Sequence, residues 1–180
     1  RTKATIAREK GLEPLAQKIW EQSSNYDPES EAKAFIDTEK EVANSEEALA
    51  GARDIIGEWV NDDADARAEL RSYYLSESTL ASKVMLGKES EGEKFRDYFD
   101  WSEPANKAPS HRILAIRRGE SEMTLSMTVR PDEDVAISKL EHRFVSGQSP
   151  ASEQVRLAIK DGFKRLLSIS METAARLGLK

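Results

Sequence analysis

The side chains that most often carry enzyme chemistry are scarce in this sequence. Its 180 residues contain two histidines, His111 and His142, and no cysteine. Neither histidine has a second histidine at the helical spacing that a zinc site on one helix requires. Ser110 adjoins His111, but a serine nucleophile and its base must converge in space, whereas adjacent side chains point apart. We therefore predict no catalytic, cofactor-binding or metal-binding residue, and we expect a protein that is not an enzyme.

Two acidic clusters are the other candidates for cation chemistry. They consist of Asp62, Asp63 and Asp65, and of residues 132–134 directly after Pro131. A calcium loop needs further oxygen ligands, a central glycine and a closing glutamate at set positions, and the first cluster lacks them. The second cluster is typical of an exposed turn. We interpret both clusters as helix caps or solvated surface.

Basic side chains are the remaining candidates for a functional site, because lysine and arginine neutralise the phosphates of nucleic acid. The formal net charge of −6 argues against strong affinity of the whole chain for nucleic acid, so any basic surface must be local. Two groups of basic residues stand out: Arg112, Arg117, Arg118 and Arg130, and then Arg156, Lys160 and Lys164 at intervals of four. We predict weak contacts of these residues with RNA or DNA, without sequence preference. The alternative for the second group is a solvated helix face.

A mainly α, multi-helical fold must position these residues. The strongest helical pattern runs over residues 45–60, where apolar residues recur at steps of three and four. Asp27 and Pro28 predict the N-cap and first position of a short helix, because aspartate accepts a free amide and proline has none to leave unpaired. Residues 61–63 predict the cap of a further helix.

The first 22 residues predict a helix-turn-helix-like start. Gly11 can adopt the left-handed conformation that ends a helix, and Pro14 is acceptable only in the first turn of the next helix. The second helix offers few donors to base edges, so we favour a packing motif over a reader of DNA sequence. An alternative function is a docking module that binds the transcription or translation machinery through the helical face from Ile6 to Trp20.

The hydrophobic period changes over residues 112–129. Leu114 and Ile116 alternate with Ala115 and Arg117, and a similar alternation continues to Val129. We expect one small antiparallel β-hairpin that turns near Gly119. The helical period returns after Pro150. We therefore predict an N-terminal helical region over 1–78, an irregular segment with the hairpin over 79–148, and a connecting helix over 149–180.

Composition also indicates where the protein acts. No apolar stretch approaches the roughly 18 to 20 residues that cross a bilayer, and the charged start does not resemble a signal peptide. A chain without cysteine suits a reducing compartment. We expect a cytoplasmic protein with no membrane partner.

Three stretches carry a resemblance to known proteins. The most specific runs from Gly87 to Gly119 and reads GKESEGEKFRDYFDWSEPANKAPSHRILAIRRG. The other two, in the same order and spacing, are RTKATIAREKGLEPLA at the start and AKAFIDTEKEVANSEEALAGARDIIGE over 32–58. Together they resemble the bacterial Tex family of transcription accessory proteins over nearly the whole chain.

The resemblance implies a longer protein. Tex proteins carry an N-terminal helical region, a resolvase-like RNase-H-fold domain, helix-hairpin-helix elements and a terminal S1 RNA-binding domain. This chain would cover part of the first region, and residues 149–180 would lead towards the missing RNase-H-like domain. No catalytic residue of the family falls on these positions. The resemblance therefore implies a non-catalytic helical scaffold that binds nucleic acid mainly through missing domains, with the transcription machinery as a further expected partner.

Overall fold

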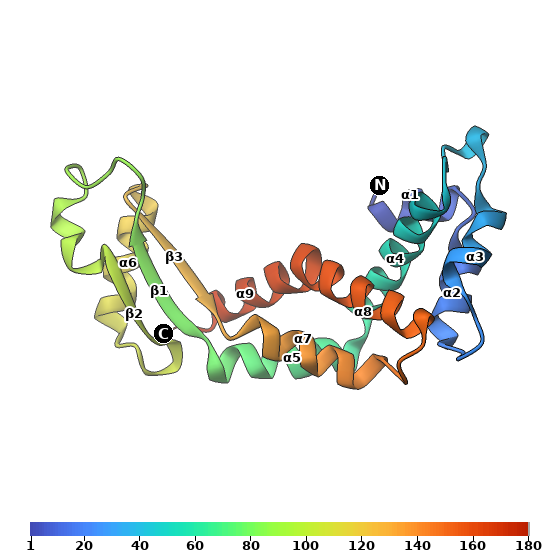
Figure 1. Cartoon of the computed structure of the whole chain (residues 1–180). Coiled ribbons are helices and arrows are strands. Elements are labelled where there is room, and N and C mark those ends of the chain that lie inside the picture. The colour runs from blue at the N-terminus through green and yellow to red at the C-terminus, as the bar shows by residue number, and fades with distance from the viewer. Residues whose placement is uncertain (180) are drawn as a thin grey trace. The chain divides into compact units, whose positions relative to one another are not determined.

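The computed structural model describes residues 1–179 and confirms a mainly α-helical fold (Figure 1). The α-helices are α1 (Lys3–Glu9), α2 (Glu13–Glu21), α3 (Pro28–Ala32), α4 (Ser45–Asp62), α5 (Ala64–Glu77), α6 (Ser110–Ser121), α7 (Glu133–Phe144), α8 (Pro150–Gly162) and α9 (Ser168–Leu177). The strands are β1 (Thr79–Val84), β2 (Asp100–Pro104) and β3 (Leu125–Arg130). Short 3-10 helices include η3 (Glu93–Tyr98), and a π-helical turn (Phe163–Leu167) joins α8 to α9.

The chain folds into two compact units. Unit 1 combines Arg1–Arg67 with Ile137–Leu167, and unit 2 combines Ala68–Ala136 with the residues from Ser168 onward. The chain therefore passes between the units within α5, within α7 and where the π-helical turn meets α9. Each unit is assembled from segments that lie far apart in the sequence.

Helix α4 is the centre of unit 1 and packs against α1, α2, α3 and α8. It confirms the helix predicted over residues 45–60, because the apolar side chains of the pattern are buried: Ala48, Leu49, Ala52, Ile55, Ile56 and Val60. The Asn44 side chain accepts the Glu47 amide at 2.9 Å, and the Glu47 carboxylate accepts the Ala43 amide at 2.7 Å. The Asn44 side chain therefore caps the start of the helix, and Glu47 binds the amide that precedes the cap.

Two glycines let α4 and α8 approach closely. A Cβ atom added to Gly162 would lie 3.1 Å from the Cα of Gly57, whereas one added to Gly57 would keep 3.5 Å from its nearest neighbours. Val155, Ile159 and Phe163 are buried along the same stretch. The two helices therefore meet almost backbone to backbone.

The two helices and the turn expected at the start of the chain are present in unit 1. Gly11 has a φ of +78° between α1 and α2, and Pro14 lies in the first turn of α2. Asp27 accepts the amide of Ser30 at 3.5 Å at the beginning of α3, as its predicted capping role requires.

Unit 2 contains an antiparallel sheet in the order β2-β1-β3. Ser82 in the central strand β1 lies opposite Trp101 of β2 and Met127 of β3. Helices α6 and α9 both contact β3. The buried side chains of β3 are Leu125, Met127 and Val129, so its alternating pattern is confirmed.

The predicted turn near Gly119 was wrong, together with the strand expected to precede it. Residues 110–121 form α6, because Ile113, Ile116 and Gly119 occupy one helical face and are buried, while Leu114 is 64% exposed. The strand that pairs with β3 is β1, which lies in the segment expected to be irregular. Four alternating residues were too few to separate the two periods.

The acidic residues after Pro131 begin a helix rather than an isolated turn. Asp132 accepts the Asp134 amide at 2.9 Å where α7 starts. Asp63 accepts the Ala66 amide at 2.8 Å where α5 starts, as the predicted cap requires. Among the described residues, no helix has both the length and the apolar character needed to cross a bilayer.

Candidate nucleic-acid interface

Arg112 lies in the first turn of α6 and is bound to β2. Its Nη1 donates to both carboxylate oxygens of Glu103, at 3.0 and 2.8 Å. Its guanidinium lies over the Trp101 ring, 4.7 Å from the ring centroid. The indole Nε1 of Trp101 donates to the same carboxylate at 2.6 Å. The hydrogen bond to Glu103 raises the pKa of Arg112.

The other three predicted arginines of unit 2 differ in what they contact. Arg117 donates to the backbone carbonyl of Arg176 in the last turn of α9, and Arg130 pairs with Glu172 at 3.1 Å. Arg118 is exposed on α6. The structure therefore brings Arg117 and Arg130 to α9 and leaves Arg118 in solvent.

Two side chains of α9 form hydrogen bonds with the backbone of the edge strand β3, and the sequence analysis identified neither of them. Glu172 accepts the Val129 amide at 2.9 Å, and Arg176 donates to the Met127 carbonyl at 3.0 Å. Edge strands expose unpaired backbone groups, and these side chains satisfy two of them. The spacing of four between Glu172 and Arg176 was the available signal, because it places both on one helix face.

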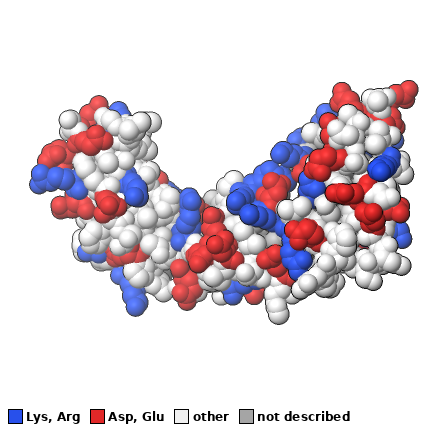
Figure 2. Space-filling model, viewed as in Figure 1, with Lys and Arg blue, Asp and Glu red and all other residues white. Residues whose placement is uncertain are grey.

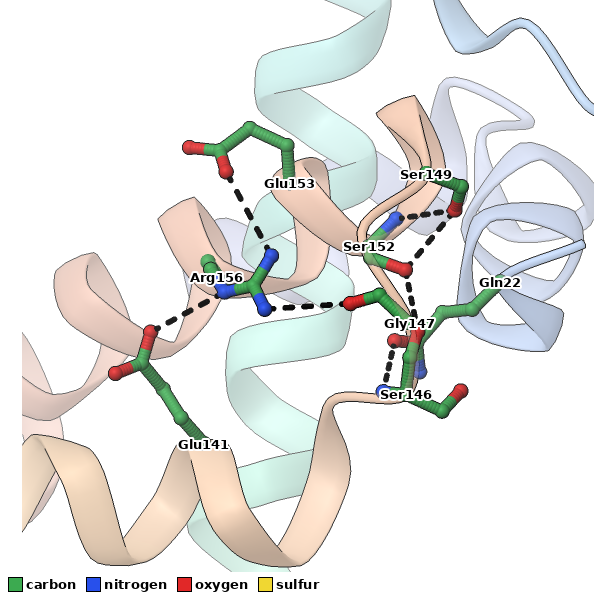
Figure 3. A network of polar contacts seen from close by, with 8 residues as sticks. All are labelled: Gln22, Glu141, Ser146, Gly147, Ser149, Ser152, Glu153 and Arg156. Atoms are coloured by element: carbon green, nitrogen blue, oxygen red, sulfur yellow. Dashed lines mark hydrogen bonds and ion pairs between the residues drawn. The ribbon is translucent and has the colours of Figure 1, made fainter. Parts of the chain in front are cut away.

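Arg156 belongs to a polar network that holds the α7–α8 connection in unit 1 (Figure 3). Its guanidinium pairs with Glu141 at 3.7 Å and Glu153 at 3.8 Å, and donates to the Gly147 carbonyl at 3.3 Å. Gly147 has a φ of +70°, which suits glycine. Arg156 therefore ties α8 to α7 and to the connection between them.

The same connection is fixed at its other side by Gln22 and two serines. Gln22 donates to the Phe144 carbonyl at 2.9 Å and accepts the Ser146 amide at 2.8 Å. Ser152, which is fully buried, donates to the Ser146 carbonyl at 2.5 Å, and Ser149 caps α8 by accepting the Ser152 amide at 3.1 Å (Figure 3). The network joins residues more than 120 positions apart.

Lys160 and Lys164 are exposed, but they do not continue a regular α-helix from Arg156. Helix α8 ends at Gly162, and Lys164 lies in the π-helical turn. The wider π turn changes the angle between successive residues, so the predicted stripe with one constant spacing is interrupted there.

Arg165, in the same π-helical turn, pairs with Asp54 of α4 at 3.7 Å. Burial raises the pKa of Asp54, while the charges of Arg165 and Lys3 act to lower it. Asp161 also bonds Arg165, at 3.4 Å. This arginine, which the sequence did not single out, therefore joins the π turn to α4.

Charges of both signs are mixed on one face of the molecule. Figure 2 shows lysine and arginine side chains interspersed with aspartate and glutamate on the face in view. His111 and His142 are both exposed. Within residues 1–179, no group of three or more histidine, aspartate or glutamate side chains is arranged to hold a metal ion. The seven predicted residues are also divided, with four in unit 2 and three in unit 1.

Comparison with known proteins adds the family. Residues 23–178 match the family described as Tex central region-like. The chain belongs to the Tex family. Protein YhgF of Escherichia coli (strain K12) is 45% identical over 132 residues, which cover 73% of this chain and 17% of that protein. Protein tex of Bordetella pertussis is 42% identical over 135 residues, covering 75% and 17% respectively.

A further relative carries a functional name. Transcriptional accessory protein Tex of Neisseria gonorrhoeae is 36% identical over 168 residues, which cover 92% of this chain and 21% of that protein. The matches thus cover 17% to 21% of the length of these three relatives. The resemblance to Tex proteins is therefore confirmed for the region that this chain covers.

The segment from Gly87 to Gly119, which most specifically resembles Tex proteins, builds much of unit 2. Phe95 is buried, and the Tyr98 carbonyl accepts the Ser82 hydroxyl at 2.6 Å. The Ala105 amide donates to the Ser78 carbonyl at 2.9 Å. In this Tex-family chain, these contacts hold the segment against β1.

Proposed function

We propose that this chain is a non-catalytic helical scaffold within a cytoplasmic, Tex-like transcription accessory protein, which binds RNA or DNA mainly through domains outside this chain. The observation that carries the proposal is the use of arginines within the fold: Arg112, Arg117, Arg130 and Arg156 each bind a carboxylate or carbonyl of their own unit. A guanidinium paired with a carboxylate adds little net charge, so it releases few counterions from nucleic acid.

The comparisons support the context of this proposal. A relative in Neisseria gonorrhoeae is named a transcriptional accessory protein, and this chain matches 21% of its length. The remaining length leaves room for the nucleic-acid-binding and RNase-H-like domains that the resemblance implies, and the segment over 149–180 would lead towards them. Arg118, Lys160 and Lys164 are exposed and would make the minor contribution of this chain.

The docking alternative has less support. The apolar residues of the face from Ile6 to Trp20 are largely used inside unit 1, where Leu15, Ala16 and Ile19 are fully buried. Trp20 packs against Trp59 and Phe144, with ring centroids 5.8 and 5.6 Å apart. A helical face whose apolar side chains are already covered offers little area to a partner.

A binding comparison tests the scaffold proposal. Fluorescence anisotropy would measure the Kd of the 180-residue chain and of a full-length Tex-family protein for one labelled oligonucleotide at 0.15 M salt. We expect the chain to bind with a Kd of about 10⁻⁴ to 10⁻⁶ M, which is typical of non-specific contacts, and the full-length protein to bind much more tightly. A chain whose affinity came within about threefold of the full-length protein would overturn the proposal.

A further inference from the structure

The two outer strands of the sheet in unit 2 differ in what binds their outer edges. The strand order β2-β1-β3 leaves each outer strand with one edge that does not pair with β1 (Figure 1). On β3, side chains of α9 bind the Val129 amide and the Met127 carbonyl along this edge. An edge strand without such partners can pair with a further strand. The outer edge of β2 is therefore the one to consider.

The register of the sheet shows which backbone groups of β2 point away from β1. The Val84 amide donates to the Phe99 carbonyl at 2.9 Å, so Phe99 faces β1. Because directions alternate along an antiparallel strand, Ser102 presents its amide and carbonyl outward, and Asp100 presents its carbonyl outward. Within residues 1–179, these three backbone groups have no hydrogen-bond partner, and both residues are exposed. Ser102 thus offers the paired donor and acceptor with which an antiparallel strand binds the next one.

The features that usually protect an edge strand are limited in β2. Pro104 lies at an outward position, where it removes one amide from the edge but leaves the groups of Ser102 in place. Lysine, which often blocks such edges, does not occur within β2, whose charged residues are Asp100 and Glu103. The usable part of the edge is therefore short, acidic and centred on Ser102.

The side chains of β2 select what can pair with this edge. The Asp100 side chain is 89% exposed, and its ion pair with Lys83 is long, at 3.6 Å. A lysine or arginine opposite Asp100 is favourable, whereas the phosphates of nucleic acid are repelled. On the other face of the strand, Trp101 is partly exposed, and a β-branched side chain packs well opposite an aromatic ring. The edge therefore fits an extended peptide in which basic and β-branched residues alternate.

We propose that the outer edge of β2, centred on Ser102, binds an extended basic segment of a partner protein as a fourth strand of the sheet. Backbone hydrogen bonds supply the affinity, and Asp100 and Trp101 supply the preference for sequence. The proposal does not rest on the scaffold proposal, because it needs only unit 2. It also concerns a different surface from the helical face of Ile6 to Trp20, which belongs to unit 1.

The test uses a seven-residue peptide, blocked at both ends, in which lysine and valine alternate and lysine stands first and last. When it pairs with β2, its lysine amides face the strand and its valine amides face away. N-methylation of the lysine amides should weaken binding to the 180-residue chain at least about tenfold, because several backbone hydrogen bonds are lost. N-methylation of the valine amides is the matched control and should change the Kd less than about threefold. Equal effects, or no binding of the unmodified peptide at millimolar concentration, would overturn the proposal.

Hydrogen exchange places the peptide without any substitution. Binding should slow exchange of the Ser102 amide, which then donates to the peptide. The Val129 amide on the opposite edge is already bound by Glu172, so its exchange should not change. Protection that appears at Val129 and not at Ser102 would refute the assignment to β2.

Charge reversal separates strand pairing from general attraction. Asp100→Lys places a positive charge opposite a peptide lysine and should weaken binding at least about fivefold. The lost ion pair with Lys83 is exposed, so the fold should be kept. Asp97→Lys makes the same change in net charge at an exposed position of η3, outside the strand, and should stay within about twofold. Equal losses in the two variants would show attraction by net charge and reject pairing with β2.

Two further measurements separate the partner protein from other occupants of the edge. A full-length Tex-family protein should bind the peptide with a Kd within about threefold of that of the 180-residue chain. If it does not bind, a segment of the same protein covers the edge, and the partner is excluded. In sedimentation velocity, the chain alone should be monomeric at the concentrations used. A dimer that the peptide dissociates would assign the edge to a second copy instead.

Discussion

At the scale of single residues, the α7–α8 connection shows that buried polar atoms are paired across long stretches of sequence. Ser152 is fully buried, and its hydroxyl donates to the Ser146 carbonyl at 2.5 Å. Ser146, by contrast, is exposed and takes part through its backbone. Removing a buried donor leaves its acceptor without a partner, and desolvation of that acceptor is then uncompensated.

We predict that Ser152→Ala lowers the free energy of unfolding by about 1–3 kcal/mol, because the Ser146 carbonyl loses its donor. The same chemical change at the exposed position, Ser146→Ala, should cost less than about 0.5 kcal/mol. Urea denaturation of both variants measures the difference. Equal stabilities would show that water replaces the Ser152 hydroxyl without loss.

Residue roles could be predicted from the sequence where the partners are close in the chain. Asp27, Asp63 and Gly11 act within three residues of themselves, so composition and spacing reveal their capping or turning roles. The sequence identifies Arg117 as a basic residue, but it does not predict the hydrogen bond to the Arg176 carbonyl, which lies 59 residues away. Its partner depends on how unit 2 folds, which no local pattern specifies.

At the scale of elements, the hydrophobic period of the sequence identified helices and strands only where the stretch was long or strictly alternating. Helix α4 repeats its pattern over 18 residues and was predicted, whereas the apolar run in α6 is short enough to fit both periods. Strands β1 and β2 were not predicted. In β1 a buried position is occupied by a polar residue, Ser82, and in β2 Trp101 is covered in part by the Arg112 side chain and not by an apolar core. Neither strand shows the apolar alternation that marks a half-buried strand.

The crossing of α4 and α8 gives an element-scale prediction with opposite signs at two glycines. Gly162→Ala should destabilise unit 1 by about 1–3 kcal/mol, because its Cβ would press on the backbone of Gly57 at 3.1 Å. Gly57→Ala should be neutral or stabilise by up to about 1 kcal/mol, since its Cβ meets neighbours at ordinary contact distance and alanine favours the helix. Thermal unfolding of both variants checks the signs; destabilisation by similar amounts would contradict this geometry.

At the scale of the whole molecule, the compact units do not follow the order of the sequence, because each unit combines two stretches that lie far apart in the chain. Changes in composition and hydrophobic period predict three regions, 1–78, 79–148 and 149–180. This division remains a prediction. The two compact units instead join Arg1–Arg67 to Ile137–Leu167, and Ala68–Ala136 to the residues from Ser168 onward. Composition cannot reveal such an assembly, because the contacts that define it are between distant segments.

Native-state hydrogen exchange distinguishes these two descriptions. Groups of amides that open together report cooperative units, each with its own opening free energy. Since α8 packs on α4 and α9 on β3, we predict that α8 amides lose protection together with α4, and α9 amides together with β3. The change should fall at the π-helical turn, Phe163–Leu167, where the α-helical hydrogen-bond pattern is interrupted.

Gly162→Ala supplies the control for this exchange experiment, because the substitution touches only the α4–α8 crossing. It should lower the opening free energy of α4 and α8 together by about 1–3 kcal/mol, and change that of α9 and β3 by less than about 0.5 kcal/mol. If α8 and α9 instead opened as one helix, separately from α4 and from β3, the connecting helix over 149–180 would be the cooperative element. The sequence division would then describe the molecule better than the contacts do.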